Sequence, residues 1–170
     1  FMTANALSLK TRVVRNTWLA QVSKAKVLGV CLQETRFRKH GIFMLGDFVC
    51  VSGAASKIGA HGTAVCFNTK VPIAIAVVTT RKYVYVKREH VVLVYADGRL
   101  VIAKLMAPGC QLLVVSGHAP HSQNKDVAKW WEALPGLVEG AGKDLPVWVG
   151  IDPNINVNQM QQPYVGEVVS

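Results

Sequence analysis

The chain has 170 residues, of which 51% are hydrophobic and 17% are charged, a composition typical of a folded domain and not of a disordered segment. A domain of this length buries roughly 70% of the surface that its unfolded chain exposes, so its stability requires neither disulfides nor a structural metal. The longest apolar run, residues 71–78, is far shorter than the ~20 residues of a transmembrane helix, so we expect no membrane partner.

The charge is positive and unevenly distributed. The chain has 19 Lys and Arg against 10 Asp and Glu, a net charge of +9. Residues 1–50 carry eight basic and two acidic residues, whereas residues 105–170 carry three basic and six acidic ones. This pattern favours a polyanionic partner that binds mainly the first part of the chain, although it also fits a protein that is merely basic.

Four cysteines, Cys31, Cys50, Cys66 and Cys110, lie among apolar neighbours and form no C-x-x-C pair, so we expect them to be reduced, buried and inert. The first residues contain neither the basic region nor the long apolar region of a secretory signal. A start at Phe1 suggests a piece of a longer reading frame.

The predicted elements alternate between strands and helices. Residues 3–9 alternate as in a strand, and the spacing of Val14, Trp18 and Val22 predicts an amphipathic helix over 11–25. A buried strand follows over 26–32, and Asp97-Gly98 predicts a hairpin turn. The β-rich runs are 42–51, 63–68, 72–79, 83–86, 90–95, 99–106 and 110–117.

A second helix is predicted to begin near Asn124, where Asn or Ser would cap it, and to end or kink at Pro135-Gly136. A short buried strand is expected over 147–151, and no packed element is expected in the polar tail after Asn154. This order predicts an α+β fold, a layered α/β sandwich. No G-x-G-x-x-G or P-loop occurs, which argues against nucleotide binding through those devices.

Polar side chains lie in or directly after four apolar strands. They are Asn5, Gln33-Glu34, the segment from Ser116 to His121, and Asp152-Pro153-Asn154. Because parallel strands of one core end at a common edge, we expect these side chains to converge there.

The residues at these strand ends suit the hydrolysis of a phosphodiester. Glu34 is a hard oxygen ligand for Mg²⁺, which takes only one or two carboxylates and keeps several waters. Asp152 is predicted to orient or deprotonate the attacking water, and Asn154 to donate to a phosphate oxygen. His118 is predicted to act as an acid or as a phosphate donor.

Four segments in this order resemble motifs of the endonuclease/exonuclease/phosphatase superfamily, which has the deoxyribonuclease I-like fold. They are residues 3–9 (TANALSL), 32–35 (LQET), 114–120 (VVSGHAP) and 150–154 (GIDPN). The segment His118-Ala119-Pro120-His121 with its Trp130-Trp131 helix, and the strand 62–68, are most similar to endonuclease domains of non-LTR retrotransposons. The resemblance implies a four-layer αββα sandwich, here a single incomplete domain over residues 1–170.

The resemblance also implies an activity, the metal-dependent nicking of DNA with Mg²⁺ or Mn²⁺. The protein is expected to be intracellular, in the nucleus or elsewhere in the cell, and to be encoded beside a reverse transcriptase. It implies that Asn5 and Glu34 are the amide and the carboxylate on the metal side. It places His118 near the scissile phosphate and makes Asp152 and Asn154 the Asp-x-Asn pair of the family.

The sequence departs from the family in two places. Ile151 stands directly before Asp152, where the family has Gly, and Gly150 lies one position earlier. The family's further Asp and its Asp-His pair have no counterpart before Ser170. We therefore expect weak or no nuclease activity from residues 1–170 alone, and the rest of a longer polypeptide as a partner.

Each assignment has a structural alternative. Glu34 is otherwise a solvated charge, Asn5 a turn amide, and His118 a satisfied core histidine. Asp152 and Asn154 can form an Asx turn without any catalysis. His118 and His121 have zinc-ligand spacing, but no Cys or further His stands near them in sequence to complete a zinc site, and His121 otherwise caps the helix entry or lies on the surface.

Basic and aromatic residues leave a second set of alternatives. Arg36, Arg38 and Lys39, and the pair Arg81-Lys82, either contact phosphates or belong to solvated loops. Trp130 and Trp131 are expected to serve helix packing and not base stacking, with one of them exposed. The same fold also serves phosphatases and RNA-directed nucleases, and a remnant that only binds nucleic acid is the non-enzymatic alternative.

Overall fold

The structure is a computed structural model that describes residues 1–75 and 82–155. Among these residues, a first sheet contains β1 (Met2–Asn5), β2 (Gly29–Gln33), β5 (Thr63–Asn68), β4 (Phe48–Gly53) and β3 (Gly41–Leu45), in that order. A second sheet contains β11 (Val147–Asp152), β10 (Cys110–His118), β9 (Leu100–Ala107) and β8 (Val91–Ala96). A separate ribbon pairs β6 (Pro72–Ile75) with β7 (Lys82–Tyr85), and the 3-10 helix η1 (Arg88–His90) leads from it into β8.

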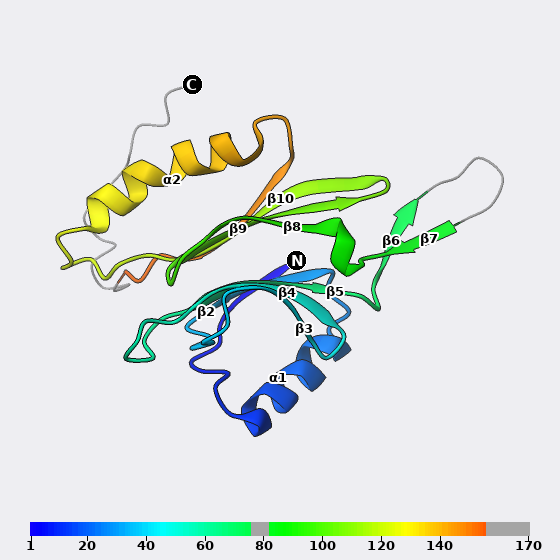
Figure 1. Cartoon of the computed structure of the whole chain (residues 1–170), viewed down its shortest axis with the longest axis horizontal. Coiled ribbons are helices and arrows are strands. Elements are labelled where there is room, and N and C mark those ends of the chain that lie inside the picture. The colour runs from blue at the N-terminus through cyan, green and yellow to red at the C-terminus, as the bar shows by residue number, and fades with distance from the viewer. Residues whose placement is uncertain (76–81, 156–170) are drawn as a thin grey trace.

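The two sheets pack face to face, and a helix covers the outer face of each (Figure 1). Helix α1 (Arg12–Lys24) lies on the first sheet and α2 (Val127–Gly142) on the second. The helix, sheet, sheet, helix order confirms the predicted αββα sandwich of the α+β class.

Three apolar layers hold the sandwich together. Between the sheets, β2, β4 and β5 meet β9 and β10, and β2, β4 and β5 are buried along their whole length. The strands of the central layer are therefore apolar on both faces, which explains why they read as continuous hydrophobic runs. The largest fully buried apolar side chains are Phe48, Phe67, Leu9, Leu32, Ile102, Leu105 and Leu113.

Two predicted strands are shorter than expected because turns interrupt them. The predicted strand over 3–9 ends at Asn5, whose side-chain oxygen accepts the N–H of Leu7 at 3.0 Å, and Leu7 has a positive φ of 51°. The predicted strand over 42–51 is in fact the hairpin β3–β4, which turns at Gly46 with a φ of 56°. Asx turns and glycine override strand propensity at both points.

The helices differ from the predictions in detail. In α1, Trp18, Leu19 and Val22 pack on the sheet, but Val14 is 44% exposed, so the expected apolar stripe is shorter. Helix α2 begins at Val127 and not near Asn124, whose side chain instead accepts the N–H of Asp126.

The expectation that Pro135-Gly136 ends the second helix is wrong, because α2 continues through Pro135 to Gly142. Leu134, Val138 and Ala141 pack on the second sheet, and this burial outweighs the cost of an interior proline. In the same helix Trp130 packs on the sheet and Trp131 is 37% exposed, which fits the expected packing role.

Other predictions concern the cysteines and the membrane. The four cysteines are free; Cys31, Cys50 and Cys66 are buried, whereas Cys110 is only partly so. No helix in the described part of the chain is long and apolar enough to cross a membrane. Some predictions concern positions outside the described residues. These are the strand residues 76–79, Arg81, the Lys82 side chain and the polar tail from residue 156.

Candidate functional site

Two pairs of parallel strands end at the same edge of the sandwich. Asn5 lies opposite Gln33 where β1 pairs with β2, and His118 lies opposite Asp152 where β10 pairs with β11. Across the gap between the sheets, β1 contacts β11 and β2 contacts β10. The predicted convergence of the polar strand ends is therefore found.

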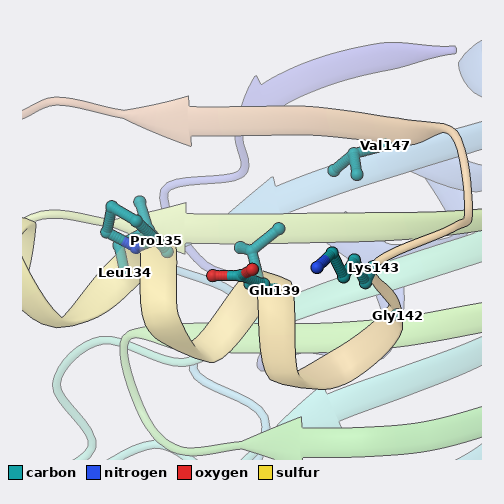
Figure 2. Close-up of a pocket in the computed structure, with 7 residues that line it drawn as sticks. Leu134, Pro135, Glu139, Gly142, Lys143 and Val147 are labelled. Atoms are coloured by element: carbon teal, nitrogen blue, oxygen red, sulfur yellow. The ribbon is translucent and has the colours of Figure 1, made fainter.

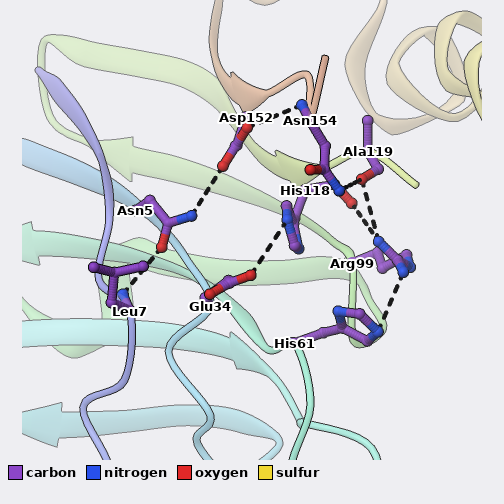
Figure 3. A network of polar contacts seen from close by, with 9 residues as sticks. All are labelled: Asn5, Leu7, Glu34, His61, Arg99, His118, Ala119, Asp152 and Asn154. Carbon is purple, nitrogen blue, oxygen red and sulfur yellow. Dashed lines mark hydrogen bonds and ion pairs between the residues drawn. The ribbon is translucent and has the colours of Figure 1, made fainter. Parts of the chain in front are cut away.

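Side chains from the two ends of the described chain meet at this edge (Figure 3). Asn5 Nδ2 donates to Asp152 Oδ2 at 3.0 Å, although 147 positions separate the two residues. The Asn5 oxygen accepts the N–H of Leu7, so the turn amide expected as the alternative is also present. Asn5 thus has a local structural role and a place in the site.

The Asp-x-Asn segment forms a compact turn. Asp152 Oδ1 accepts the N–H of Asn154 at 2.9 Å, and Asn154 has a left-handed φ of 52°. Asn154 Nδ2 donates to the carbonyl of Ala119 at 3.2 Å. The Asx turn and the convergence with Asn5 therefore occur together and do not exclude each other.

Glu34 and His118 form the second contact across the sheets. His118 Nε2 lies 3.7 Å from Glu34 Oε1, and the Glu34 side chain is 28% exposed. His118 is buried, which lowers its pKa below the ordinary 6.5, although the carboxylates of Asp152 and Glu34 act to raise it. The imidazole is consequently neutral at physiological pH, and no described residue hydrogen-bonds to its buried Nδ1.

The backbone around Glu34 is strained and firmly held. Glu34 has a φ of 54°, a left-handed conformation that costs a non-glycine residue of order 1 kcal/mol or more. On either side, the Gln33 carbonyl accepts the N–H of Ala6 at 2.8 Å, and the N–H of Thr35 donates to Gly62 at 2.9 Å. These bonds hold the turn that directs the Glu34 carboxylate toward His118.

Gln33 links the four strands beneath the site. Its Nε2 lies 3.1 Å from the Gly150 carbonyl and 3.3 Å from both Ser116 Oγ and Thr3 Oγ1. The amide has two hydrogens for these three acceptors, so one hydrogen is shared between two of them. Ser116 Oγ in turn donates to the Leu32 carbonyl at 3.2 Å. This buried network joins β1, β2, β10 and β11 at the positions just before their polar ends.

The departure at Gly150-Ile151 does not separate Asp152 from Asn5. A Cβ at Gly150 would lie 2.7 Å from the Cβ of Cys31, so glycine is required where β11 crosses β2. Asp152, two residues later, still reaches Asn5.

The basic segment after Glu34 lies at the surface. Arg36, Arg38 and Lys39 are exposed, and none of them pairs with a carboxylate among the described residues. Lys39 Nζ lies 5.2 Å from the centre of the Phe43 ring. Their positive charge is therefore available to a polyanion next to Glu34.

Two further residues of the network were not predicted. Arg99 donates from one guanidinium nitrogen to the carbonyls of His118 and Ala119 at 3.3 and 3.2 Å, and its other nitrogen lies 3.2 Å from His61 Nε2. The His61 and His118 rings are 5.7 Å apart. The only signals in the sequence are a basic residue after the predicted Asp97-Gly98 turn and a histidine before the strand 62–68.

The donor set suits magnesium better than zinc. His121 is exposed and its Nδ1 accepts the N–H of Gln123, so it does not join His118 in a zinc site. No three Asp, Glu, His or Cys side chains in the described part of the chain are grouped to hold a metal. Glu34, Asp152 and Asn5 are oxygen donors, and Mg²⁺ requires only one or two carboxylates because water completes its shell.

A groove along α2 is separate from this site (Figure 2). It is lined by Leu134, Pro135, Val138, Glu139, Gly142, Lys143 and Val147, and it shares no residue with the polar network.

Comparison with known proteins supports the fold. The chain is similar in structure to the endonuclease domain of TRAS1, a telomere-specific non-LTR retrotransposon, with a TM-score of 0.57 and 12% sequence identity. The match covers 92% of this chain and 59% of that chain. No family model and no curated protein matches the sequence. At this identity the similarity shows the fold, and it confirms the deoxyribonuclease I-like architecture that the motifs predicted.

Proposed function

We propose that this chain hydrolyses phosphodiester bonds in DNA as a metal-dependent endonuclease of the retroelement type. The observation that carries the proposal is the meeting of four polar strand ends, with Asn5 on Asp152 at 3.0 Å and Glu34 beside His118 at 3.7 Å. The fold shared with a retrotransposon endonuclease domain supports the same function. We propose that the protein is intracellular, because its proposed substrate, DNA, lies inside the cell.

Glu34 and Asn5 are proposed to hold Mg²⁺, or Mn²⁺ in its place. A bound ion of this kind polarises a phosphoryl oxygen and stabilises the negative charge of the transition state. The Glu34 carboxylate is partly open to solvent, and the Asn5 oxygen uses one lone pair for the N–H of Leu7 and keeps the other. The Glu34 carboxylate and the Asn5 oxygen therefore each have a lone pair free to bind a cation.

Asp152 is proposed to orient and deprotonate the attacking water. Each of its oxygens already accepts one hydrogen bond, from Asn5 and from the N–H of Asn154, which fixes the carboxylate and leaves further lone pairs for a water. Asn154 uses one amide hydrogen for the Ala119 carbonyl and has a second to donate to a phosphate oxygen. His118 is proposed to donate a hydrogen bond to a phosphate oxygen. Its neutral ring can do this, whereas transfer of a proton as a general acid would require the protonated ring.

The proposed partner is the DNA backbone. The chain has a net charge of +9. Arg36, Arg38 and Lys39 lie just after Glu34 and Thr35; they are exposed and form no ion pair with any carboxylate that the structure describes. Phosphates bound by such residues release counterions, so DNA affinity should fall steeply as salt rises.

Two assays on residues 1–170 test the proposal. One measures plasmid nicking, and the other measures Mn²⁺ binding by electron paramagnetic resonance. We expect slow Mg²⁺-dependent nicking, because the chain spans 59% of the matched domain. Glu34→Gln should lower the nicking rate at least about 100-fold and weaken Mn²⁺ binding, since a ligand that supplies several kcal/mol is lost. Glu139→Gln, in the groove of α2, is the matched control and should change neither.

Three results would contradict the proposal. One is nicking that persists in EDTA, and another is Mn²⁺ binding that is the same in Glu34→Gln and in the unchanged chain. The third is salt-dependent DNA binding without nicking or metal binding, which would identify a protein that only binds nucleic acid.

A further inference from the structure

Arg99 is held at the site by neutral acceptors. It follows the turn between β8 and β9, where Asp97 Oδ1 accepts the N–H groups of Arg99 and Leu100, each at 2.7 Å. The guanidinium donates to the carbonyls of His118 and Ala119. No carboxylate in the described part of the chain forms an ion pair with it, although the charge of Asp97 acts on it from farther away. A guanidinium without an ion-pair partner therefore lies beside His118.

His61 lies between this turn and the segment after Glu34. Its carbonyl accepts the N–H of Arg36 at 3.0 Å, and the N–H of the next residue, Gly62, donates to Gly98 at 2.9 Å. These bonds fix the backbone of His61 at a φ of 64° and its ring 5.7 Å from the ring of His118. The histidine is thus a fixed part of the edge that carries Glu34 and His118 (Figure 3).

The contact with Arg99 determines which ring nitrogen of His61 carries the proton. A guanidinium only donates, so His61 Nε2, at 3.2 Å, must accept, and the neutral ring carries its proton on Nδ1. Burial, Arg99 and His118 lower the pKa of His61 and outweigh Glu34, which acts to raise it, so the ring stays neutral. Within the described residues, Nδ1 of His61 forms no hydrogen bond. Its N–H is therefore a fixed donor, free to bind a ligand, next to the Arg99 guanidinium.

We propose that His61 is a second phosphate-binding residue of this site, in which Nδ1–H donates to a backbone phosphate of bound DNA on the His118 side. Arg99 is the positioning residue that sets the tautomer of His61. The inference rests on the proposed function, because it requires DNA at this edge of the sandwich. A neutral donor within a positive field binds a phosphate oxygen well, since hydrogen bonds to charged groups are the stronger ones.

The first test measures binding of a labelled DNA duplex to residues 1–170 in EDTA by fluorescence anisotropy. His61→Gly removes the ring and tolerates the positive φ, and it should weaken binding about ten-fold, the loss of one hydrogen bond to a charged group. His61→Asn also tolerates this φ and keeps an amide N–H at a similar distance along the side chain as Nδ1, so it should bind within about three-fold of the unchanged chain. His90→Ala is the control, because His90 is the last residue of η1, at the end of β8 that is remote from the Asp97-Gly98 turn.

The second test is nitrogen NMR of the His61 ring, which a merely structural role would leave unaffected by DNA. We expect the Nδ1–H tautomer in the free protein, a shift of this N–H when DNA is added, and loss of the single tautomer in Arg99→Lys. An Nε2–H tautomer would overturn the inference, as would equal DNA affinities of His61→Gly and the unchanged chain, or a failure of His61→Asn to restore binding.

These outcomes are distinguishable from failure of the proposed function. The binding test contains no metal, so DNA affinity that depends on His61 stands even if Glu34→Gln leaves nicking unchanged. Conversely, nicking that depends on Glu34, with binding that ignores His61, overturns only the further inference. A chain that does not bind the duplex overturns both.

Discussion

Replacing Gln33 with methionine tests how the two sheets are held together beneath the site. Gln33 is 1% exposed, and its amide reaches Gly150 on β11, Ser116 on β10 and Thr3 on β1. Methionine has a similar length and fills the same space without donating. Gln33→Met therefore removes the polar tie and leaves the packing volume nearly unchanged.

The expected loss follows from the two hydrogens that the amide donates. A net contribution of about 0.5–1.5 kcal/mol is typical of each hydrogen bond, and the contacts at 3.3 Å belong at the low end of that range. Burial of a more apolar side chain offsets part of the loss. We expect the free energy of unfolding to fall by about 1–2 kcal/mol and the melting temperature by about 2–8 °C.

Urea unfolding followed by tryptophan fluorescence measures this difference, with calorimetry as a second probe. Gln21→Met is the matched control, because Gln21 is exposed on α1 and its side chain forms no hydrogen bond with the residues that the structure describes. A loss below about 0.5 kcal/mol for Gln33→Met, no larger than that of a surface substitution, would refute the view that this amide joins the sheets.

A second readout connects this network to the site. Gln33 lies one residue before Glu34, and Gly150 lies two residues before Asp152. If the amide sets the distance between β2 and β11, Gln33→Met should also weaken Mn²⁺ binding by more than the control does. Unchanged Mn²⁺ affinity together with reduced stability would restrict Gln33 to a purely structural role.

Three other predictions follow from burial and packing. Stability should fall as the pH drops below 6.5, because the pKa of His118 is lowered in the folded state and the unfolded chain takes up the proton first. Urea midpoints measured between about pH 7 and about pH 5 should show this dependence, and His118→Gln should reduce it. Gly150→Ala should lower the free energy of unfolding by about 1–3 kcal/mol through its clash with Cys31, whereas Gly136→Ala, with nothing within 4 Å of the new Cβ, should raise it by about 0.5–1 kcal/mol. Burial raises the pKa of Cys31, so a thiol reagent should modify Cys110 first and Cys31 only on unfolding, and equal rates would contradict the assigned burial.

The sequence predicts this fold and the strand ends well for a physical reason. Strands buried on both faces give apolar runs, and a polar residue at the end of such a run is conspicuous. Glu34, His118 and Asp152 were found in this way, and the parallel pairing of β1 with β2 and of β10 with β11 brings them to one edge. The order of the motifs added the layer arrangement, which the hydrophobic pattern alone does not determine.

The missed features depend on contacts between distant segments. His61 and Arg99 lie in turns, where no periodic pattern indicates the direction of a side chain, and they meet only because two hairpins pack together. Gln33 was visible as a polar residue, but its bonds to three other strands were not. Pro135 shows the reverse case, since burial of α2 overrides a strong local signal.

One side of the candidate site is buried and the other is exposed to solvent, and this difference affects how strongly its charges act on a bound phosphate. His118 is buried and its neighbours are fixed, whereas Glu34 is partly exposed and Asn5 is exposed. On the exposed side water weakens the field of the carboxylates, so their electrostatic effect on a phosphate is small until water is excluded. A bound duplex, held by Arg36, Arg38 and Lys39, would itself exclude that water. Substitutions of these three residues should therefore lower the rate of nicking of bound DNA as well as the affinity, and an effect on affinity alone would show that something other than the substrate dehydrates the site.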